Sequence, residues 1–143
     1  MNEQTISLVQ KSFKSLIPVA DQVGTTFYAR LFEAYPDVRP MFAADIGPQS
    51  KKLVQMLAVV VNGLDRLDTI LPAVRQLARR HKGYGVVEGH YGAVGETLIG
   101  TLRLGLGDGF TPEVEAAWTQ AYTTLSTAMI AATKEDALED ALA

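Results

Sequence analysis

The chemistry that this sequence can offer a metal ion is concentrated in two histidines, because the chain contains no cysteine. One of them, His81, ends a run in which apolar residues recur at spacings of three and four. That spacing gathers side chains on one face of a helix, here Leu71, Val74, Leu77, Ala78 and His81. A neutral imidazole at the end of this face can offer a ring nitrogen to a metal in a dry pocket. It can equally be a core histidine bonded to a carbonyl, and the segment alone leaves both interpretations open.

The overall composition limits the classes of function. The 143 residues are 48% hydrophobic and 20% charged, which is typical of one globular domain with a substantial core. A net charge of −3 argues against nucleic acid as the main partner. No apolar run is long enough to span a bilayer, and the N-terminal residues lack a signal-peptide pattern. We therefore expect a cytoplasmic protein that binds neither nucleic acid nor membranes.

Helical periodicity dominates the chain and predicts an all-α fold of about seven helices in a single domain, residues 1–143. We expect a core over about residues 2–133 and a tail at 134–143 that extends the last helix or frays. The expected helices cover about 2–17, 18–35, 47–64, a segment from Asp68 to Gly83, 88–106 and 112–132, with a short helical turn from Pro36 to Phe42. Glycines inside a helix cost about 1 kcal/mol each relative to alanine, so we expect close neighbours at Gly92, Gly95 and Gly100.

Several motifs, in this order along the chain, resemble those of the bacterial single-domain globins and the haem domain of flavohaemoglobins, most closely the Hell's Gate globin type. They are FYARLF with Tyr28, Pro-x-Phe at Phe42, QSKKL with Gln49 and Leu53, LPAVRQLARRHKGYGV with His81, HYGAVGETL with Tyr91, and AAW with Trp118. The likeness runs from about residue 5 to 132, and several spaced motifs are a stronger signal than any single one. It implies a globin fold around haem b.

The resemblance also implies roles for residues around the haem. His81 matches the proximal histidine, which coordinates the iron through one ring nitrogen while the other donates to a carbonyl or a side chain. Phe42 matches the aromatic that stacks on the porphyrin, although a simple core role would bury it equally. Lys52 is either a partner of a haem propionate or a solvated surface lysine. The remaining pocket positions fall on Leu53, Leu57, Leu77, Val86, Tyr91 and Val94.

On the ligand-binding side, the sequence has no histidine between Phe42 and His81, and the resemblance assigns this side to Tyr28, Gln49 and Leu53. Bound dioxygen carries partial negative charge, so a phenol O–H and an amide N–H would both stabilise it. Two alternatives stay open: Tyr28 can be bonded to a backbone carbonyl, and Gln49 can be a gate residue that points to solvent. We expect the second histidine, His90, to be exposed.

One departure from the flavohaemoglobin pattern concerns the support of the proximal histidine. In that family a tyrosine and a glutamate increase the basicity of the imidazole. Tyr91 is present here, but the position of the glutamate falls on Thr133, with Glu135 two residues further on. A threonine cannot give the same anionic support, so the resemblance does not extend to strong electron donation from the proximal side.

Together these features predict a haem protein that binds dioxygen reversibly with high affinity, and that also takes carbon monoxide and nitric oxide as ligands. The alternative is a nitric oxide dioxygenase, which converts nitric oxide and dioxygen to nitrate in the same pocket. Each cycle would leave ferric haem, and the chain ends where a reductase would begin in flavohaemoglobins. The enzyme would therefore depend on an external reductase. We expect a monomer or a weak homodimer.

Overall fold

The protein is described by a computed structural model that covers the backbone of residues 1–83 and 88–142 and the side chains of residues 1–82 and 89–134. Within these ranges the chain forms six α-helices and four short 3-10 helices, without a strand. The α-helices are α1 (Glu3–Leu16), α2 (Ala20–Ala34), α3 (Gly47–Asn62), α4 (Leu67–Gly83), α5 (Glu88–Leu106) and α6 (Pro112–Leu142). The 3-10 helices are η1 (Ile17–Val19), η2 (Pro36–Met41), η3 (Leu64–Arg66) and η4 (Gly107–Gly109). The all-α prediction is confirmed.

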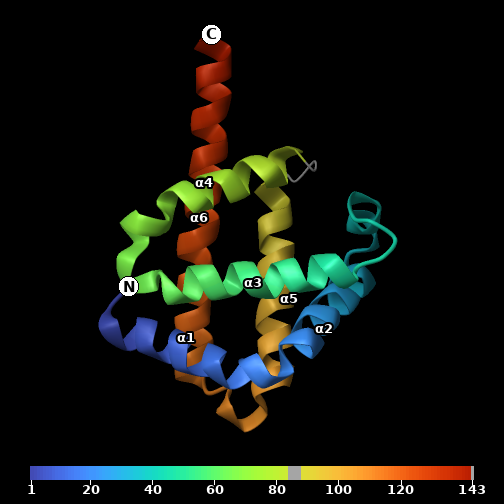
Figure 1. The fold of residues 1–143 in the computed structure, drawn as a ribbon, viewed down its shortest axis with the longest axis vertical. Coiled ribbons are helices and arrows are strands. Elements are labelled where there is room, and N and C mark those ends of the chain that lie inside the picture. The colour runs from blue at the N-terminus through green and yellow to red at the C-terminus, as the bar shows by residue number, and fades with distance from the viewer. Residues whose placement is uncertain (84–87, 143) are drawn as a thin grey trace.

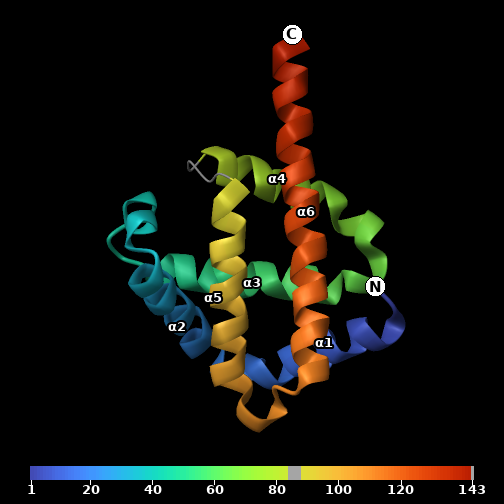
Figure 2. The same ribbon diagram turned by 180° about the vertical axis from the view of Figure 1, so that it is seen from behind.

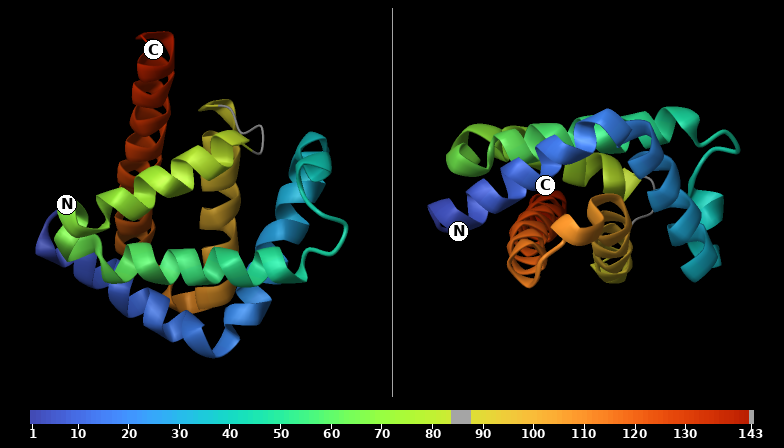
Figure 3. Two further views of the ribbon diagram at one scale, coloured as in Figure 1. Left: turned by 45° about the horizontal axis from the view of Figure 1, so that its top comes forward. Right: turned by 90° about the horizontal axis from the view of Figure 1, so that it is seen from below.

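The helices form crossing layers. Figure 1 shows α3 running across α5 and α6, and Figure 2 shows the same molecule from behind, with α5 and α6 side by side. Seen from below, α5 and α6 lie in one layer and α3 in another (Figure 3). The most extensive contacts join α4 to α6, α1 to α6, α2 to α3 and α2 to α5. The described helices include none long and apolar enough to cross a membrane.

Local sequence signals explain where most helices begin and end. Asn2 caps α1 by accepting a hydrogen bond from the amide of Thr5 at 2.8 Å, and Thr111 caps α6 through the amide of Val114 at 3.2 Å. The predicted short turn before Phe42 is a 3-10 helix, in agreement with two prolines that cannot supply α-helical amide donors. Helix α4 begins at Leu67, one residue before the expected start, and holds Pro72 inside it. Helix α6 continues to Leu142, which is the extension that the sequence offered as one of two alternatives for the tail.

Two apolar clusters hold these helices together. The larger one joins α1, α2, α3, α5 and α6, and includes Phe13, Phe27, Leu102 and Trp118. The indole N–H of Trp118 also donates to Ser12 at 2.8 Å, which links α6 to α1. The smaller cluster is made of Val74 and Ala78 from α4 with Met129 and Ala132 from α6. Helix α4, which carries His81, is therefore positioned mainly by α6.

Glycines allow close approach at specific crossings. A Cβ atom on Gly24 of α2 would lie 2.8 Å from the carbonyl oxygen of Ser50, so α2 and α3 meet backbone to backbone. In α5, the expected close neighbours exist at Gly95, where the ring of Tyr122 lies 2.7 Å from the position of a Cβ, and at Gly100, next to Arg30. The same expectation is wrong for Gly92, because no described atom beyond its own stretch of helix lies within 4 Å of the position of a Cβ there.

Candidate functional site

Tyr28 and Gln49 meet across the close α2–α3 crossing. Tyr28 is only 4% exposed, and its hydroxyl oxygen accepts a hydrogen bond from the Gln49 side-chain amide at 3.1 Å. Burial raises the pKa of Tyr28, and the bond from Gln49 offsets part of that rise. The phenol is therefore protonated at neutral pH and keeps its own O–H as a donor. The resemblance predicted both residues as donors to a bound ligand, and it could not show that one donates to the other.

Aromatic rings surround the Tyr28 phenol. The Phe27 ring lies edge-on to it at 5.0 Å and the Phe42 ring at 5.4 Å, measured between centroids. Phe32 contacts both, at 5.9 Å from Tyr28 and 5.4 Å from Phe42. Such edge-to-face pairs are favourable beyond the area that they bury. They fix the orientation of the phenol, and they bring Phe42, from the loop after η2, next to Tyr28. The sequence did not identify Phe32, because a helical aromatic at core spacing has no distinguishing signal.

Arg39 organises the loop that carries Phe42. Its guanidinium donates to the carbonyl oxygens of Phe42, Ala43 and Ala44 at 3.0–3.2 Å, and it lies over the Phe32 ring at 4.8 Å from the centroid. A planar guanidinium can donate to several acceptors at once, and it can also stack on the face of an aromatic ring. Arg39 therefore positions Phe42 without being part of any motif. Its role depends on hydrogen bonds to three loop carbonyls, and a sequence does not reveal such contacts.

His81 lies in the last turn of α4, and its Nδ1 atom is 2.8 Å from the carbonyl oxygen of Leu77. Because a carbonyl only accepts, Nδ1 carries the proton in this bond and Nε2 of the neutral ring carries the lone pair. Burial lowers the pKa of His81, the bond to Leu77 raises it, and the charge of Arg80 lowers it again. The net effect favours the neutral, ligating form of the ring at pH 7.

The predicted apolar wall residues divide between the two core clusters. Leu53 and Leu57 of α3 and Val94 of α5 pack against the larger cluster that contains Tyr28. Leu77 packs against the smaller cluster of α4 and α6. All four side chains are partly exposed rather than fully buried. Val86 lies outside the described residues.

Tyr91 belongs to the α5–α6 side of the molecule. Its ring packs against the smaller cluster, and its backbone carbonyl accepts a hydrogen bond from the hydroxyl of Tyr122 at 2.6 Å. Burial raises the pKa of both phenols. Thr133, at the position where flavohaemoglobins have a glutamate, uses its hydroxyl to donate to the Met129 carbonyl of its own helix at 3.0 Å. The side chain of Glu135 lies outside the described residues.

The two remaining predicted positions are polar. Lys52 is exposed on α3, which is compatible with either of its two predicted roles. His90, in the first turn of α5, is partly buried, so the expectation that it is exposed is wrong. Over the described parts of the chain, no three His, Asp or Glu side chains come together in a way that could hold a metal ion.

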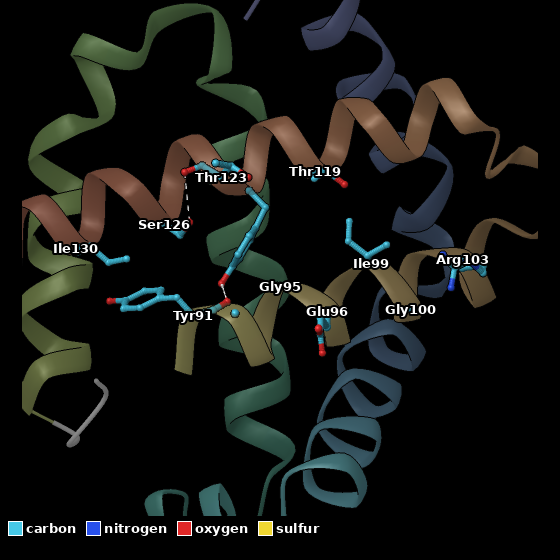
Figure 4. Close-up of a pocket in the computed structure, with 12 residues that line it drawn as sticks. Tyr91, Gly95, Glu96, Ile99, Gly100, Arg103, Thr119, Thr123, Ser126 and Ile130 are labelled. Atoms are coloured by element: carbon cyan, nitrogen blue, oxygen red, sulfur yellow. Dashed lines mark hydrogen bonds between the residues drawn. The ribbon is translucent and has the colours of Figure 1, made fainter. Parts of the chain in front are cut away.

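Two surface grooves have linings that do not include His81, Tyr28 or Gln49. The larger, of about 630 Å³, runs between α5 and α6, and of the predicted site residues only Tyr91 lines it (Figure 4). The second, of about 490 Å³, lies between α2 and α5 and is lined by Arg30, Glu33, Tyr35 and Glu96 among others. The predicted ligand-binding residues therefore belong to a different part of the molecule.

The globin family model matches residues 25–129. The flavohemoprotein of Bacillus subtilis is 31% identical over 144 residues, which cover 94% of this chain and 35% of that protein. The flavohemoprotein of Vibrio cholerae is 34% identical over 124 residues, which cover 82% of this chain and 32% of that protein. The chain thus spans about a third of the length of the curated relatives that it matches.

Solved structures of similar length match over nearly the whole chain. A bacterial globin from Campylobacter jejuni superimposes with a TM-score of 0.86 at 25% identity, covering 97% of this chain and 99% of that chain. An engineered carbene transferase, made from a candidate nitric oxide dioxygenase of Rhodothermus marinus, superimposes with a TM-score of 0.86 at 30% identity. That match covers 99% of this chain and 98% of the other.

Proposed function

This chain belongs to the globin family, which implies a haem cofactor, and from that premise we propose that it binds dioxygen reversibly and with high affinity. The cofactor in this proposal is haem b, and His81 is its protein ligand. Tyr28 and Gln49 act on the side where dioxygen binds. The observation that carries the proposal is the hydrogen bond from the Gln49 amide to the buried Tyr28 hydroxyl.

The residues present fit a haem that takes one imidazole ligand. The Nδ1 bond to the Leu77 carbonyl holds the His81 ring and leaves the lone pair on Nε2, as an iron ligand requires. Phe42, Leu53, Leu57, Leu77 and Val94 offer apolar surface to a porphyrin, and Val86 and Tyr91 complete the proposed set. Exposed Lys52 is the proposed partner of a propionate, an ion pair that contributes little to affinity when solvated.

When bound, haem supplies a ferrous iron with one open coordination position for a diatomic ligand. The chain supplies the donors around that position. The Tyr28 phenol remains protonated, and because Gln49 donates to its oxygen, the phenol can direct its own proton to a ligand of partial negative charge. Dioxygen becomes more strongly polarised on binding than carbon monoxide does. A donor of this kind therefore favours dioxygen over carbon monoxide. Because the donor stabilises bound dioxygen, it slows release, and high dioxygen affinity follows.

The second candidate function, nitric oxide dioxygenase, is supported by the names of the relatives. The flavohemoproteins are about three times longer than this chain, and one matching structure derives from a candidate nitric oxide dioxygenase. The reaction combines one nitric oxide, one dioxygen and one electron to give nitrate, so it needs an electron donor in every cycle. Sustained nitric oxide consumption with NADH and an added flavin reductase would favour this function, and a single turnover would favour dioxygen binding.

The test of haem ligation compares two histidine variants. We expect His81→Gly to lose haem, or to recover a normal spectrum only with added imidazole, because glycine leaves an open position next to the iron. His90→Ala is the matched control and should keep the wild-type visible spectrum. A pyridine haemochrome spectrum identifies the haem type, with haem b expected. Loss of ligation in His90→Ala, with His81→Gly unaffected, would overturn the assignment.

A further inference from the structure

The loop that joins η2 to α3 depends on one side chain for its hydrogen bonds. This loop spans residues 42–46. Over the described residues, no backbone amide donates to the carbonyl oxygens of Phe42, Ala43 or Ala44. The Arg39 guanidinium donates to all three, at 3.2, 3.0 and 3.0 Å respectively. Since the backbone offers these carbonyls no other partner, the conformation of the loop depends on this half-buried arginine.

The same guanidinium ties the loop to α2. It lies over the Phe32 ring, 4.8 Å from the centroid, and Phe32 follows Tyr28 by one helical turn. The rings of Phe32, Phe42 and Tyr28 contact one another pairwise, with centroids 5.4–5.9 Å apart. Arg39 thus holds two of the three rings, one through its backbone carbonyl and one through its face. The third ring, the phenol of Tyr28, packs against both.

The other end of the loop is fixed to α3. The Asp45 carboxylate accepts a hydrogen bond from the amide of Gly47 at 3.0 Å. The Ile46 carbonyl accepts from the amide and the hydroxyl of Ser50, at 2.9 and 3.1 Å. Gln49 lies in this first turn of α3. The loop is therefore continuous with the turn that places the Gln49 amide.

We propose that Arg39 is a positioning residue for ligand binding: by clamping the 42–46 loop to Phe32, it holds the Tyr28 phenol in the orientation from which it donates to dioxygen. This inference rests on the proposed function, in which that phenol is the donor. Arg39 acts through the neighbouring rings. A phenol held in one orientation directs its proton to one point, whereas a phenol that can tilt does so for only part of the time.

Three variants separate the clamp from its charge. Arg39→Ala removes the whole clamp. Arg39→Lys keeps the charge, but an ammonium has no planar fork for three carbonyls and no flat face for the Phe32 ring. The lysine variant should therefore retain only part of the effect, and it replaces the alanine variant if alanine prevents folding. Arg30→Ala is the matched control, because Arg30 lies next to Gly100 of α5 instead of the loop.

The first measurement reports the environment of the phenol directly. Haem-loaded, carbon-monoxide-bound protein is labelled with ¹³C at the tyrosine Cζ atoms, and NMR resolves the Tyr28 signal among five tyrosines by its loss in Tyr28→Phe. Wild type should give one narrow Tyr28 signal. Arg39→Ala should shift and broaden or split it, because the ring then samples several orientations. Arg39→Lys should have a smaller effect, and Arg30→Ala should leave the signal unchanged.

The second measurement is the dioxygen dissociation rate. Arg39→Ala should raise it about threefold to fivefold in the wild-type background, but by about 1.5-fold or less in Tyr28→Phe, which has no hydroxyl left to position. The carbon monoxide dissociation rate should change less than about twofold, since that ligand depends less on a donor. An arginine with a purely structural role would raise the dioxygen rate by the same factor in both backgrounds.

The role of Arg39 and the proposed function fail in different ways. An unchanged Tyr28 signal in Arg39→Ala, or equal factors in the two backgrounds, would overturn the role of Arg39 and leave the proposed function in place. A Tyr28→Phe variant that releases dioxygen at the wild-type rate would overturn the proposed function, and the inference about Arg39 with it.

Discussion

At the scale of single residues, the proposed function depends on where the Gln49 amide and the Tyr28 hydroxyl direct their protons. Gln49 donates to the Tyr28 oxygen at 3.1 Å, so in the proposed function the amide would act on a ligand through the phenol. A donor that receives a hydrogen bond becomes a stronger donor, because chained hydrogen bonds polarise one another. The structure thus favours a relay over two independent donors. The sequence predicted the two residue types, but a side chain at one helical position can reach several partners, and their mutual bond depends on the α2–α3 crossing.

A double-mutant cycle separates the relay from independent donors. Gln49→Leu should raise the dioxygen dissociation rate about threefold in the wild-type background, which corresponds to roughly 0.65 kcal/mol. In the Tyr28→Phe background the same change should have almost no effect, because the group that relays it is gone. Stopped-flow replacement of dioxygen by carbon monoxide measures all four rates. Equal factors in the two backgrounds would contradict the relay.

At the scale of helices, the Tyr28–Gln49 pair depends on the close contact at Gly24. A Cβ atom there would lie 2.8 Å from the Ser50 carbonyl oxygen and 3.0 Å from the Ser50 Cβ, and backbone atoms cannot rotate away. Because Gln49 precedes Ser50, any shift of α3 also moves the amide relative to the phenol. The α2–α3 crossing thus contributes to stability and, in the proposed function, would also set ligand retention.

Gly24→Ala should lower the free energy of unfolding by about 1–3 kcal/mol, as overpacking at a tight contact does. Gly92→Ala is the matched control, since over the described residues no atom outside its own stretch of helix lies within 4 Å of its Cβ position. Alanine there should raise the free energy of unfolding by about 0.5–1 kcal/mol through higher helix propensity. Urea unfolding of the haem-loaded proteins measures both. A Gly24→Ala variant as stable as Gly92→Ala would show that α3 moves away without cost.

The helices themselves were largely predictable, whereas several of their contacts were not. Periodicity and caps located α1, α5 and the start of α6, because these signals are local. The start of α4 at Leu67 lies one residue from the expected one, and Pro72 lies in the second turn of the helix, where it removes one backbone hydrogen bond. The role of Arg39 and the partial burial of His90 arise from parts of the chain that come together only on folding.

At the scale of the whole molecule, the candidate site residues belong to two separately packed units. Tyr28 and Gln49 are fixed by α2 and α3 within the larger cluster, while His81 is fixed by α4 against α6 through the smaller one. A haem bound by His81 would join these units. The resemblance named candidate residues in both units, but only the fold assigns them to different helix pairs. The proposed function therefore depends on their joint action on one ligand.

Joint action is tested by the dioxygen dissociation rate of haem-loaded wild type and Tyr28→Phe. Phenylalanine keeps the ring that packs against Phe27 and Phe42 and removes only the hydroxyl. We expect a slow wild-type rate that rises about tenfold or more in Tyr28→Phe, equivalent to about 1.4 kcal/mol, with a smaller change for carbon monoxide. A rate in Tyr28→Phe that is unchanged or slower would refute the proposed function, because the phenol would then not donate to the bound ligand.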